Sequence, residues 1–404
     1  MSLKMKKLLA ILSIVPIIFL SGCWSSREIN TMAIVIGIGI DKTESGYLVT
    51  VQVLNQKAIA SKKPVDEPSV ILYSEEGKNL EEIMRRFTTK TSSILYNAHL
   101  RIVVIGEDVA KDGIKDILDF FARGHEFRTD FFFVITKDTT ANRVLSILTP
   151  FEGVPGMKMF DSLKNSEDTW ASTKSIRIVE LVNDILADGK NPVITGVEVT
   201  DEITDNKMAT TSIDALKQTQ VTNRTKYFGL GAFKKDKLVG WLDEDESKGY
   251  NYIIGNVKET VGYAEYGQKV KITYEVISAK SEIKADLVNG KPTMNVKIDI
   301  IANIGTVDGE FDVSKKENEK ILSDIAEKKV KLICKKVLNK TQKDLKTDIF
   351  EFGEVIHREY PKVWEKIKDD WNNEFVNIPV KITVDVKINQ LGQITKPFFI
   401  KEKE

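Results

Sequence analysis

The chain has 404 residues, with 59 Lys or Arg against 59 Asp or Glu, so its formal net charge is zero. Nucleic-acid-binding proteins usually carry a basic excess, and the balanced charge therefore argues against that class. A hydrophobic share of 42% is ordinary for globular proteins and excludes disorder for most of the chain. The length predicts two to three domains at roughly 150 residues each. With 2 Cys and 3 His, we expect no disulfide framework, no metal site and no cofactor.

The amino terminus has the pattern of a bacterial secretory signal peptide. A basic stretch at residues 4–7 precedes an almost wholly apolar run of 13 residues from Leu8 to Leu20. A bilayer-spanning helix needs about 20 residues, so the length and an internal proline disfavour a transmembrane helix. The run ends in Leu-Ser-Gly-Cys, which looks like a lipobox whose cysteine thiol accepts diacylglycerol. We therefore expect residues 1–22 to be removed and Cys23 to anchor the chain in membrane lipid, on the outer face of the cytoplasmic membrane.

Residues 23–165 are predicted to form a first domain in which helices and strands alternate. A strand and hairpin are expected over 31–54, followed by strands at 70–73, 101–105 and 131–135. Apolar residues at helical spacing predict helices over 80–87 and 109–121. The order of these elements predicts an α+β or α/β domain.

Residues 166–256 are predicted to form a small middle domain. A helix over 175–186 leads to a strand over 193–199, and a hairpin is expected from 227–233 and 238–242. The polar, Thr-rich segment 201–223 is expected to be an exposed excursion. These elements are too few for a large independent core.

Residues 257–404 are predicted to form a curved antiparallel sheet packed against long helices. Alternating strands flank Asn289-Gly290, the favoured pair for a type I′ turn. Ser314 and Glu317 form a capping box for a long helix whose apolar stripe includes Cys334, which we expect to be buried. A shorter helix over 355–367 and an alternating strand over 378–388 follow. The fold class predicted for the whole chain is α+β, with several domains and with mixed and antiparallel sheets packed with helices.

Several segments resemble functional motifs, but each has a simpler structural interpretation. Gly37-Ile38-Gly39 lacks the third glycine and the following helix of a dinucleotide site, and we interpret it as a site of close strand packing or a bulge. The acids at 243–246 lack the spacing of a calcium loop and suit the start of a helix. The Lys-rich helix at 315–340 can touch anionic lipid, although a solvated helix face is the favoured interpretation. His99, His125 and His357 have no metal-ligand spacing, and no nucleophile–base motif indicates catalysis.

The sequence is similar to the C-subunit lipoproteins of spore germinant receptors, the Ger(x)C family. The similarity begins at Gly-Cys-Trp around Cys23, continues through His-Leu-Arg at 99–101, and includes Phe-Lys-Lys-Asp-Lys-Leu-Val-Gly-Trp-Leu at 233–242. One departure is Ser25, where an acidic residue usually follows the tryptophan. The resemblance implies a three-domain α+β protein on the inner membrane of the spore. It also implies two integral membrane partner subunits, one of them permease-like, and no catalytic residues.

The leading hypothesis is therefore a non-enzymatic, membrane-anchored subunit of a nutrient germinant receptor needed for spore germination. The alternative is a solute-binding lipoprotein of a transporter, a class that normally has two doubly wound lobes, and a cell-wall hydrolase is a third class. Arg and Trp are enriched at the centres of interfaces. The candidate contact surface consists of Arg101, Arg123, Arg128 and Trp241. Ordinary packing and ion pairs within the domain remain the competing interpretation for these four residues.

Overall fold

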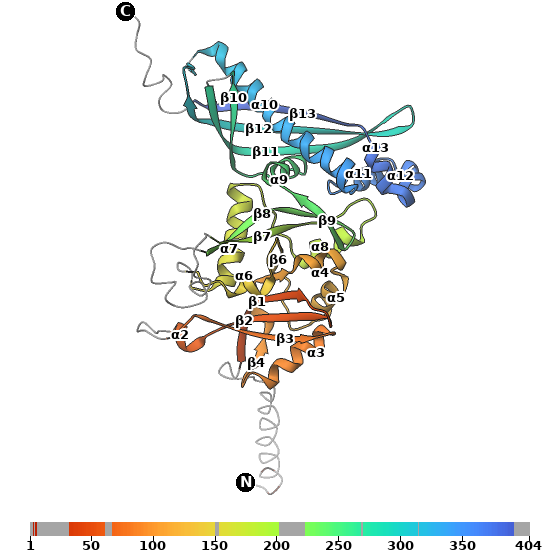
Figure 1. Ribbon diagram of the computed structural model, residues 1–404. Helices are drawn as coiled ribbons and strands as arrows, with labels where there is room; N and C mark the ends of the chain where they lie inside the picture. Colours follow the sequence, from red (N-terminus) through yellow and green to blue (C-terminus); the bar gives the residue numbers. More distant parts are fainter. Residues whose placement is uncertain are drawn as a thin grey trace, which may run out of the picture.

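The computed structural model describes residues 3, 5, 32–60, 67–149, 153–201, 223–267, 270–313 and 315–391. These residues form two β-sheets at opposite ends of an elongated molecule, with helix α9 (Glu244–Ile253) between them (Figure 1). The expected cleavage site, Cys23 and the capping residue Ser314 lie outside the described residues, as do residues 202–222 of the expected exposed excursion.

The first sheet is mixed, with the strand order β3-β2-β1-β5-β6-β7-β8-β9 and with β4 paired to β1. Its centre, from β1 through β5 and β6 to β7, is parallel, and both flanks are antiparallel. The strands are β1 (Met32–Lys42), β2 (Tyr47–Leu54), β3 (Val70–Gly77), β4 (Ile94–Tyr96), β5 (Ile102–Ile105), β6 (Phe132–Thr136), β7 (Val193–Asp201), β8 (Asn223–Lys234) and β9 (Lys237–Leu242). The predicted hairpins at both flanks are confirmed.

Helices cover both faces of this sheet, which explains why its central strands are continuous apolar runs. In β5, Val103 and Ile105 pack on one helical layer, whereas Ile102 and Val104 pack on the other. The first layer contains α3 (Leu80–Arg86), α4 (Glu107–Asp112), α5 (Lys115–Arg123) and α8 (Ile178–Leu186). The second contains α6 (Ala141–Ser146) and α7 (Pro155–Thr169), and a short helix α2 (Gln56–Ala60) follows β2.

Two features of the first sheet differ from the sequence prediction. The helix expected over 109–121 is two helices, because Gly113 has a φ of 131° that ends α4. Helices α6 and α7 were not predicted. The glycines of β1 allow α6 to approach, since a Cβ on Gly39 would lie 3.0 Å from Leu145 Cδ1 and 3.1 Å from Ala141 Cβ. The close packing at these glycines is thus with a helix, and the pairing of β1 with β2 also has a register shift between Val35 and Gly37, in line with the bulge alternative.

The boundaries of the predicted domains remain a proposal, and two of them, 165/166 and 256/257, fall within the described residues. Strands β7, β8 and β9 of the expected middle domain belong to the same sheet as the strands of the first. The boundary at 165/166 falls within helix α7, whereas 256/257 lies between α9 and the second sheet.

The second sheet has the order β10-β11-β12-β13, and its strands are β10 (Thr260–Tyr266), β11 (Val270–Val288), β12 (Lys291–Asp308) and β13 (Val380–Gln390). Asn289 and Gly290, with φ values of 53° and 76°, form the predicted turn. Strand β13 pairs with β12 in parallel, although an antiparallel pairing was expected. The helices between β12 and β13 form the long crossover that a parallel pair requires. The α+β class with mixed and antiparallel sheets is confirmed.

The long helix α10 (Lys316–Asn339) packs on the buried face of this sheet and continues into a π-helical turn (Lys340–Leu345). Cys334 is fully buried there, as predicted. The helix expected over 355–367 is interrupted at Pro361, which starts a new helix because its ring cannot continue the preceding one. The last helices are α11 (Phe352–Glu359), α12 (Pro361–Ile367) and α13 (Trp371–Asn377).

Candidate functional site

A groove with a volume of about 640 Å³ lies between helices α3 and α5, beside strand β4. Arg123 lines this groove at the end of α5, and its Nε lies 2.8 and 2.9 Å from the two carboxylate oxygens of Asp119. The same groove exposes the apolar side chain of Ile94 on β4, which is 50% exposed. Arg123 is therefore held at the rim of a mixed polar and apolar surface.

Asn97, which lines this groove, has an unusual set of hydrogen bonds. The side chain is buried, and its Oδ1 has no hydrogen-bond partner among the described residues. Its Nδ2 makes only a long contact of 3.4 Å with Glu126 Oε2. Buried polar atoms are almost always paired, because an unsatisfied acceptor costs about 1–3 kcal/mol. Because this oxygen has essentially no exposed surface, a donor from another molecule would reach it only if a neighbouring side chain moved aside.

Arg101 and Arg128 lie near the amino end of strand β6. The Arg101 Nη1 donates to Asp130 Oδ2 at 2.9 Å, and its guanidinium lies 5.4 Å from the centre of the Phe160 ring. These contacts tie the segment before β5 to the start of β6 and to helix α7. Arg128 is exposed in the turn between α5 and β6.

Trp241 on β9 lies at the other end of the parallel strands, where β5 leads into α4. Its indole Nε1 donates to Glu107 Oε1 at 3.1 Å, and its ring contacts Phe228 edge-on at 5.9 Å. Burial opposes ionisation of Glu107, but the hydrogen bonds from Trp241 and Lys111 hold the pKa of this carboxyl below its ordinary value. Arg101 lies before the first residue of β5, whereas Trp241 contacts Glu107, just after the last residue of β5. The four predicted residues therefore do not form one continuous surface.

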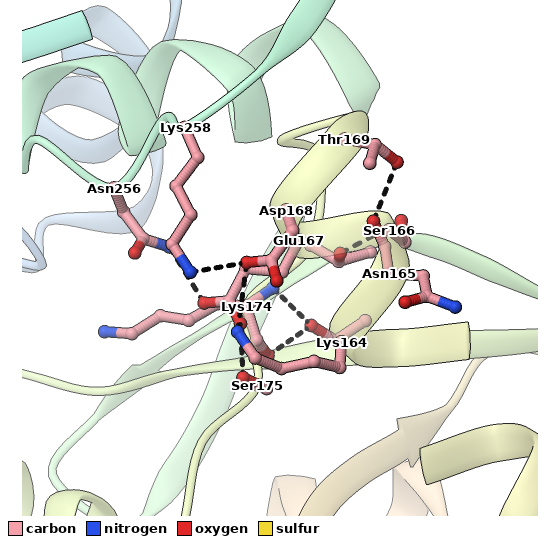
Figure 2. A network of polar contacts seen from close by, with 12 residues as sticks. Lys164, Asn165, Ser166, Glu167, Asp168, Thr169, Lys174, Ser175, Asn256 and Lys258 are labelled. Atoms are coloured by element: carbon pink, nitrogen blue, oxygen red, sulfur yellow. Dashed lines mark hydrogen bonds and ion pairs between the residues drawn. The ribbon is translucent and has the colours of Figure 1, made fainter. Parts of the chain in front are cut away.

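A polar network joins helix α7 to the segment that enters β10 (Figure 2). Lys258 and Lys164 donate to the same oxygen of Asp168, at 2.7 and 3.0 Å. Asn256 donates to Glu167 at 3.0 Å, and Ser175 also donates to Glu167. Burial opposes ionisation of Asp168, but the two lysines lower the pKa of its carboxyl. The network therefore fixes the first sheet and its helices against the chain that leads into the second sheet.

A second junction is formed by the segment after α8 and the start of α11. The backbones of Gly189 and Gly353 are in direct contact, and Asn191 N donates to the Asp348 carbonyl at 2.7 Å. The buried Asp348 carboxylate accepts from the backbone N–H groups of Phe350 and Gly353 at 2.8 and 3.0 Å. Burial nevertheless raises the pKa of Asp348 to about 7. Sequence reasoning singled out neither junction, although Lys164 and Asp168 have the i, i+4 spacing of a helical ion pair.

The remaining motifs have structural roles or stay unassigned. Asp243 and Glu246 form a capping box at the start of α9, as the helix-start interpretation predicted. Lysines of α10 pair with this acidic segment, through Lys329 to Asp245 at 3.5 Å and Lys336 to Asp243. Among the described residues, no group of three His, Cys, Asp or Glu side chains is placed to hold a metal ion. Within those same residues, no helix is both long and apolar enough to span a bilayer.

The three histidines have different surroundings. His99 contacts the Tyr96 ring edge-on at 5.6 Å, and His357 stacks on the Trp364 ring at 5.7 Å. His125 is exposed and lines the groove that holds Arg123.

Comparison with known proteins identifies the family. The model described as "Spore germination protein N-terminal domain" matches residues 25–199, and "Spore germination B3/GerAC like, C-terminal" matches residues 228–392. Spore germination protein KC of Bacillus subtilis is 32% identical, and the alignment covers 97% of both chains. Spore germination protein B3 of the same species is 25% identical, with 93% of this chain and 96% of the relative aligned.

A solved structure shares the fold. The crystal structure of the GerBC protein superimposes with a TM-score of 0.56 and 22% identity, covering 87% of this chain and 96% of that chain. The sequence relatives and this shared fold agree over nearly the whole described chain. The chain therefore belongs to the Ger(x)C family of spore germination proteins.

Proposed function

We propose that this chain is a lipid-anchored, non-enzymatic subunit of a nutrient germinant receptor. The observation that carries the proposal is the extent of the family match, which covers residues 25–199 and 228–392 and starts two residues after the expected anchor Cys23. A role in spore germination follows from family membership. The lipid anchor, the outer face of the cytoplasmic membrane and the inner membrane of the spore belong to the proposal.

The proposed partners are integral membrane receptor subunits, one of them permease-like. Only the nine peptide steps from Cys23 to Met32 separate the expected anchor from strand β1, a reach of at most about 30 Å. The first residues of β1 pair with β4, and β4 lines the groove that contains Asn97 and Arg123. The groove would therefore lie near the membrane surface. We propose that it receives an extracytoplasmic segment of a partner, with an apolar side chain against the exposed Ile94.

Anchoring would place the chain beside its partners at a high effective concentration, so that a modest interface suffices for a stable complex. Metabolic labelling with a fatty-acid probe tests the anchor. Full-length protein should incorporate the probe, Cys23→Ala should not, and Cys334→Ala should behave like the unmodified chain. Equal labelling of the Cys23→Ala variant would refute the anchor.

A photo-crosslinking amino acid at Ile94 tests the groove in spore membranes. The matched control position is Leu332, which is 62% exposed on α10, at the other end of the molecule (Figure 1). We expect crosslinks to an integral membrane subunit from position 94 and none from position 332. Crosslinks from position 332 alone would place the contact surface at α10 and exclude the groove as the docking site.

A further inference from the structure

A second, smaller cavity lies between α9, α10 and the second sheet. Its volume is about 160 Å³, and its inner wall is made of buried apolar side chains. Val276, Ile300 and Ala302 contribute from the sheet, while Ala326 and Val330 contribute from α10. The cavity therefore offers an apolar surface of the size that suits one ring or one branched chain, since apolar cavities of roughly 150 Å³ bind benzene.

Aromatic side chains form the mouth of this cavity and remain open to solvent. Trp170, at the end of α7, is 40% exposed, and Tyr263 on β10 is 53% exposed. Partly exposed aromatic side chains often line ligand pockets, where they cover the apolar part of the bound molecule. Both residues line the same cavity although they are 93 positions apart in the chain.

Lys248 of α9 brings a buried cation to the cavity. Its side chain is only 10% exposed, and its Nζ lies 3.4 Å from the centre of the Trp170 ring. The ammonium group has three donors, yet the nearest acceptors in the part of the chain that the structure describes are the Val261 carbonyl at 3.3 Å and a Glu244 carboxylate oxygen at 3.8 Å. Both distances exceed the 2.7–2.9 Å or so of a charge-assisted hydrogen bond. Burial accordingly lowers the pKa of the Lys248 amine, although Glu244 and Asp245 oppose the shift.

The acidic residues at the mouth do not block an anion from reaching Lys248. Glu244 is more than half exposed and only loosely paired, so its carboxylate can turn toward water. Asp245 is already paired with Lys329 at 3.5 Å. An incoming carboxylate would give the Lys248 ammonium the short hydrogen bond that it lacks, at a site where water is largely excluded.

We propose that this cavity binds a small monocarboxylate with an apolar body, its carboxylate on Lys248 and its body against Ala302 and Ala326. The site is separate from the α3–α5 groove, and the inference does not depend on the lipid anchor. An apolar pocket with a few convergent polar groups is the arrangement expected of a small-molecule site.

Calorimetric titration of the purified full-length chain tests the proposal, with each probe titrated into buffer as the blank. Phenylacetate is the probe, and phenylacetamide is its neutral analogue of the same shape. Phenylacetate should bind at least about tenfold more tightly than phenylacetamide, because a hydrogen bond between charged groups is stronger than one that involves a neutral group. Lys248→Met should reduce phenylacetate affinity to that of phenylacetamide. Lys335 is an exposed lysine on α10, and Lys335→Met should leave the affinity for both probes unchanged.

Ala326→Leu should fill the cavity and abolish binding of both probes, and circular dichroism establishes whether this variant folds. If it does not fold, the wild-type comparison of the two probes and the Lys248→Met titration still decide the outcome. Equal affinities for phenylacetate and phenylacetamide, or phenylacetate binding unchanged in Lys248→Met, would overturn the proposal. The absence of phenylacetate binding at millimolar concentration would overturn it as well.

Discussion

Replacing Gly353 by alanine tests how the two halves of the chain are held together. Gly353 lies in the first turn of α11, directly against the backbone of Gly189. A Cβ on Gly353 would lie 2.8 Å from the Gly189 carbonyl oxygen and 2.8 Å from Trp371 Cε2, and still closer to Gly189 Cα. Optimal contacts between such atoms are about 3.5–4.0 Å. The extra methyl group therefore overlaps with backbone, which cannot move aside as a flexible side chain can.

Two opposing effects set the size of the change. Alanine favours a helix over glycine by up to about 1 kcal/mol. Overpacking a well-filled site costs about 1–3 kcal/mol, and contacts with rigid backbone belong at the upper end of that range. We expect Gly353→Ala to lower the free energy of unfolding by roughly 2 kcal/mol, against the direction that helix propensity alone predicts.

Scanning calorimetry of the full chain measures this effect. Gly262→Ala in β10 is the matched control, because nothing lies within 4 Å of a Cβ built on Gly262 and its φ is not positive. The Gly353→Ala variant should unfold at a lower temperature, and the control should unfold at or slightly above the wild-type temperature. If Gly353→Ala proves as stable as the control, the contact with Gly189 does not constrain the junction.

Three further predictions concern individual side chains. Asp243→Ala should lower the free energy of unfolding by about 1 kcal/mol, because α9 loses its N-cap and the ion pair with Lys336. Asp243→Asn should recover part of this loss, and thermal unfolding measures both variants. Cys334 should react with a thiol reagent only after denaturation, since burial raises the pKa of its thiol, and rapid labelling of the native protein would contradict its position. Lys190→Met should lower the free energy of unfolding by about 3 kcal/mol, because the buried Asp184 carboxylate, 3.0 Å from Lys190 Nζ, loses its cationic partner. Urea unfolding measures this change, and an unchanged midpoint would refute the assignment.

Local patterns in the sequence were sufficient for much of the fold. The turn at Asn289-Gly290 requires two positive φ angles, which Asn and Gly tolerate, and the flanking alternation sets which face of β11 and β12 is buried. Cys334 was predicted to be buried from its place in a helical apolar stripe. These predictions depend on interactions within one hairpin or one helix.

Features that depend on distant contacts were missed or misjudged. The alternation of β13 is the same whether it pairs with β12 in parallel or antiparallel, so the parallel pairing could not be derived from it. Helix α7 has few apolar residues, and its position depends on Met159 and Leu163 packing against a sheet assembled from distant segments. The approach of Gly189 to Gly353 has no sequence signal of its own, because glycine also occurs in turns and loops.

The interface residues show the same limit. Arg and Trp were selected for their frequency at interfaces, and their type alone does not distinguish that role from internal pairing. The structure gives Arg101 and Arg123 a carboxylate partner each and gives Trp241 a hydrogen bond to Glu107. Of these three residues, Arg123 also lines an open groove. The unpaired Asn97 oxygen depends on which side chains the fold brings around it, and no local sequence pattern predicts it.

The germination response of spores that lack this chain tests the central claim most directly. Loss of optical density is followed after addition of single nutrients, and germination by a non-nutrient treatment serves as the control. We predict that the response to particular nutrients is lost, that the non-nutrient response is intact, and that the full chain supplied in trans restores the nutrient response. Normal germination of the deletion spores with every nutrient would contradict the assignment as a receptor subunit.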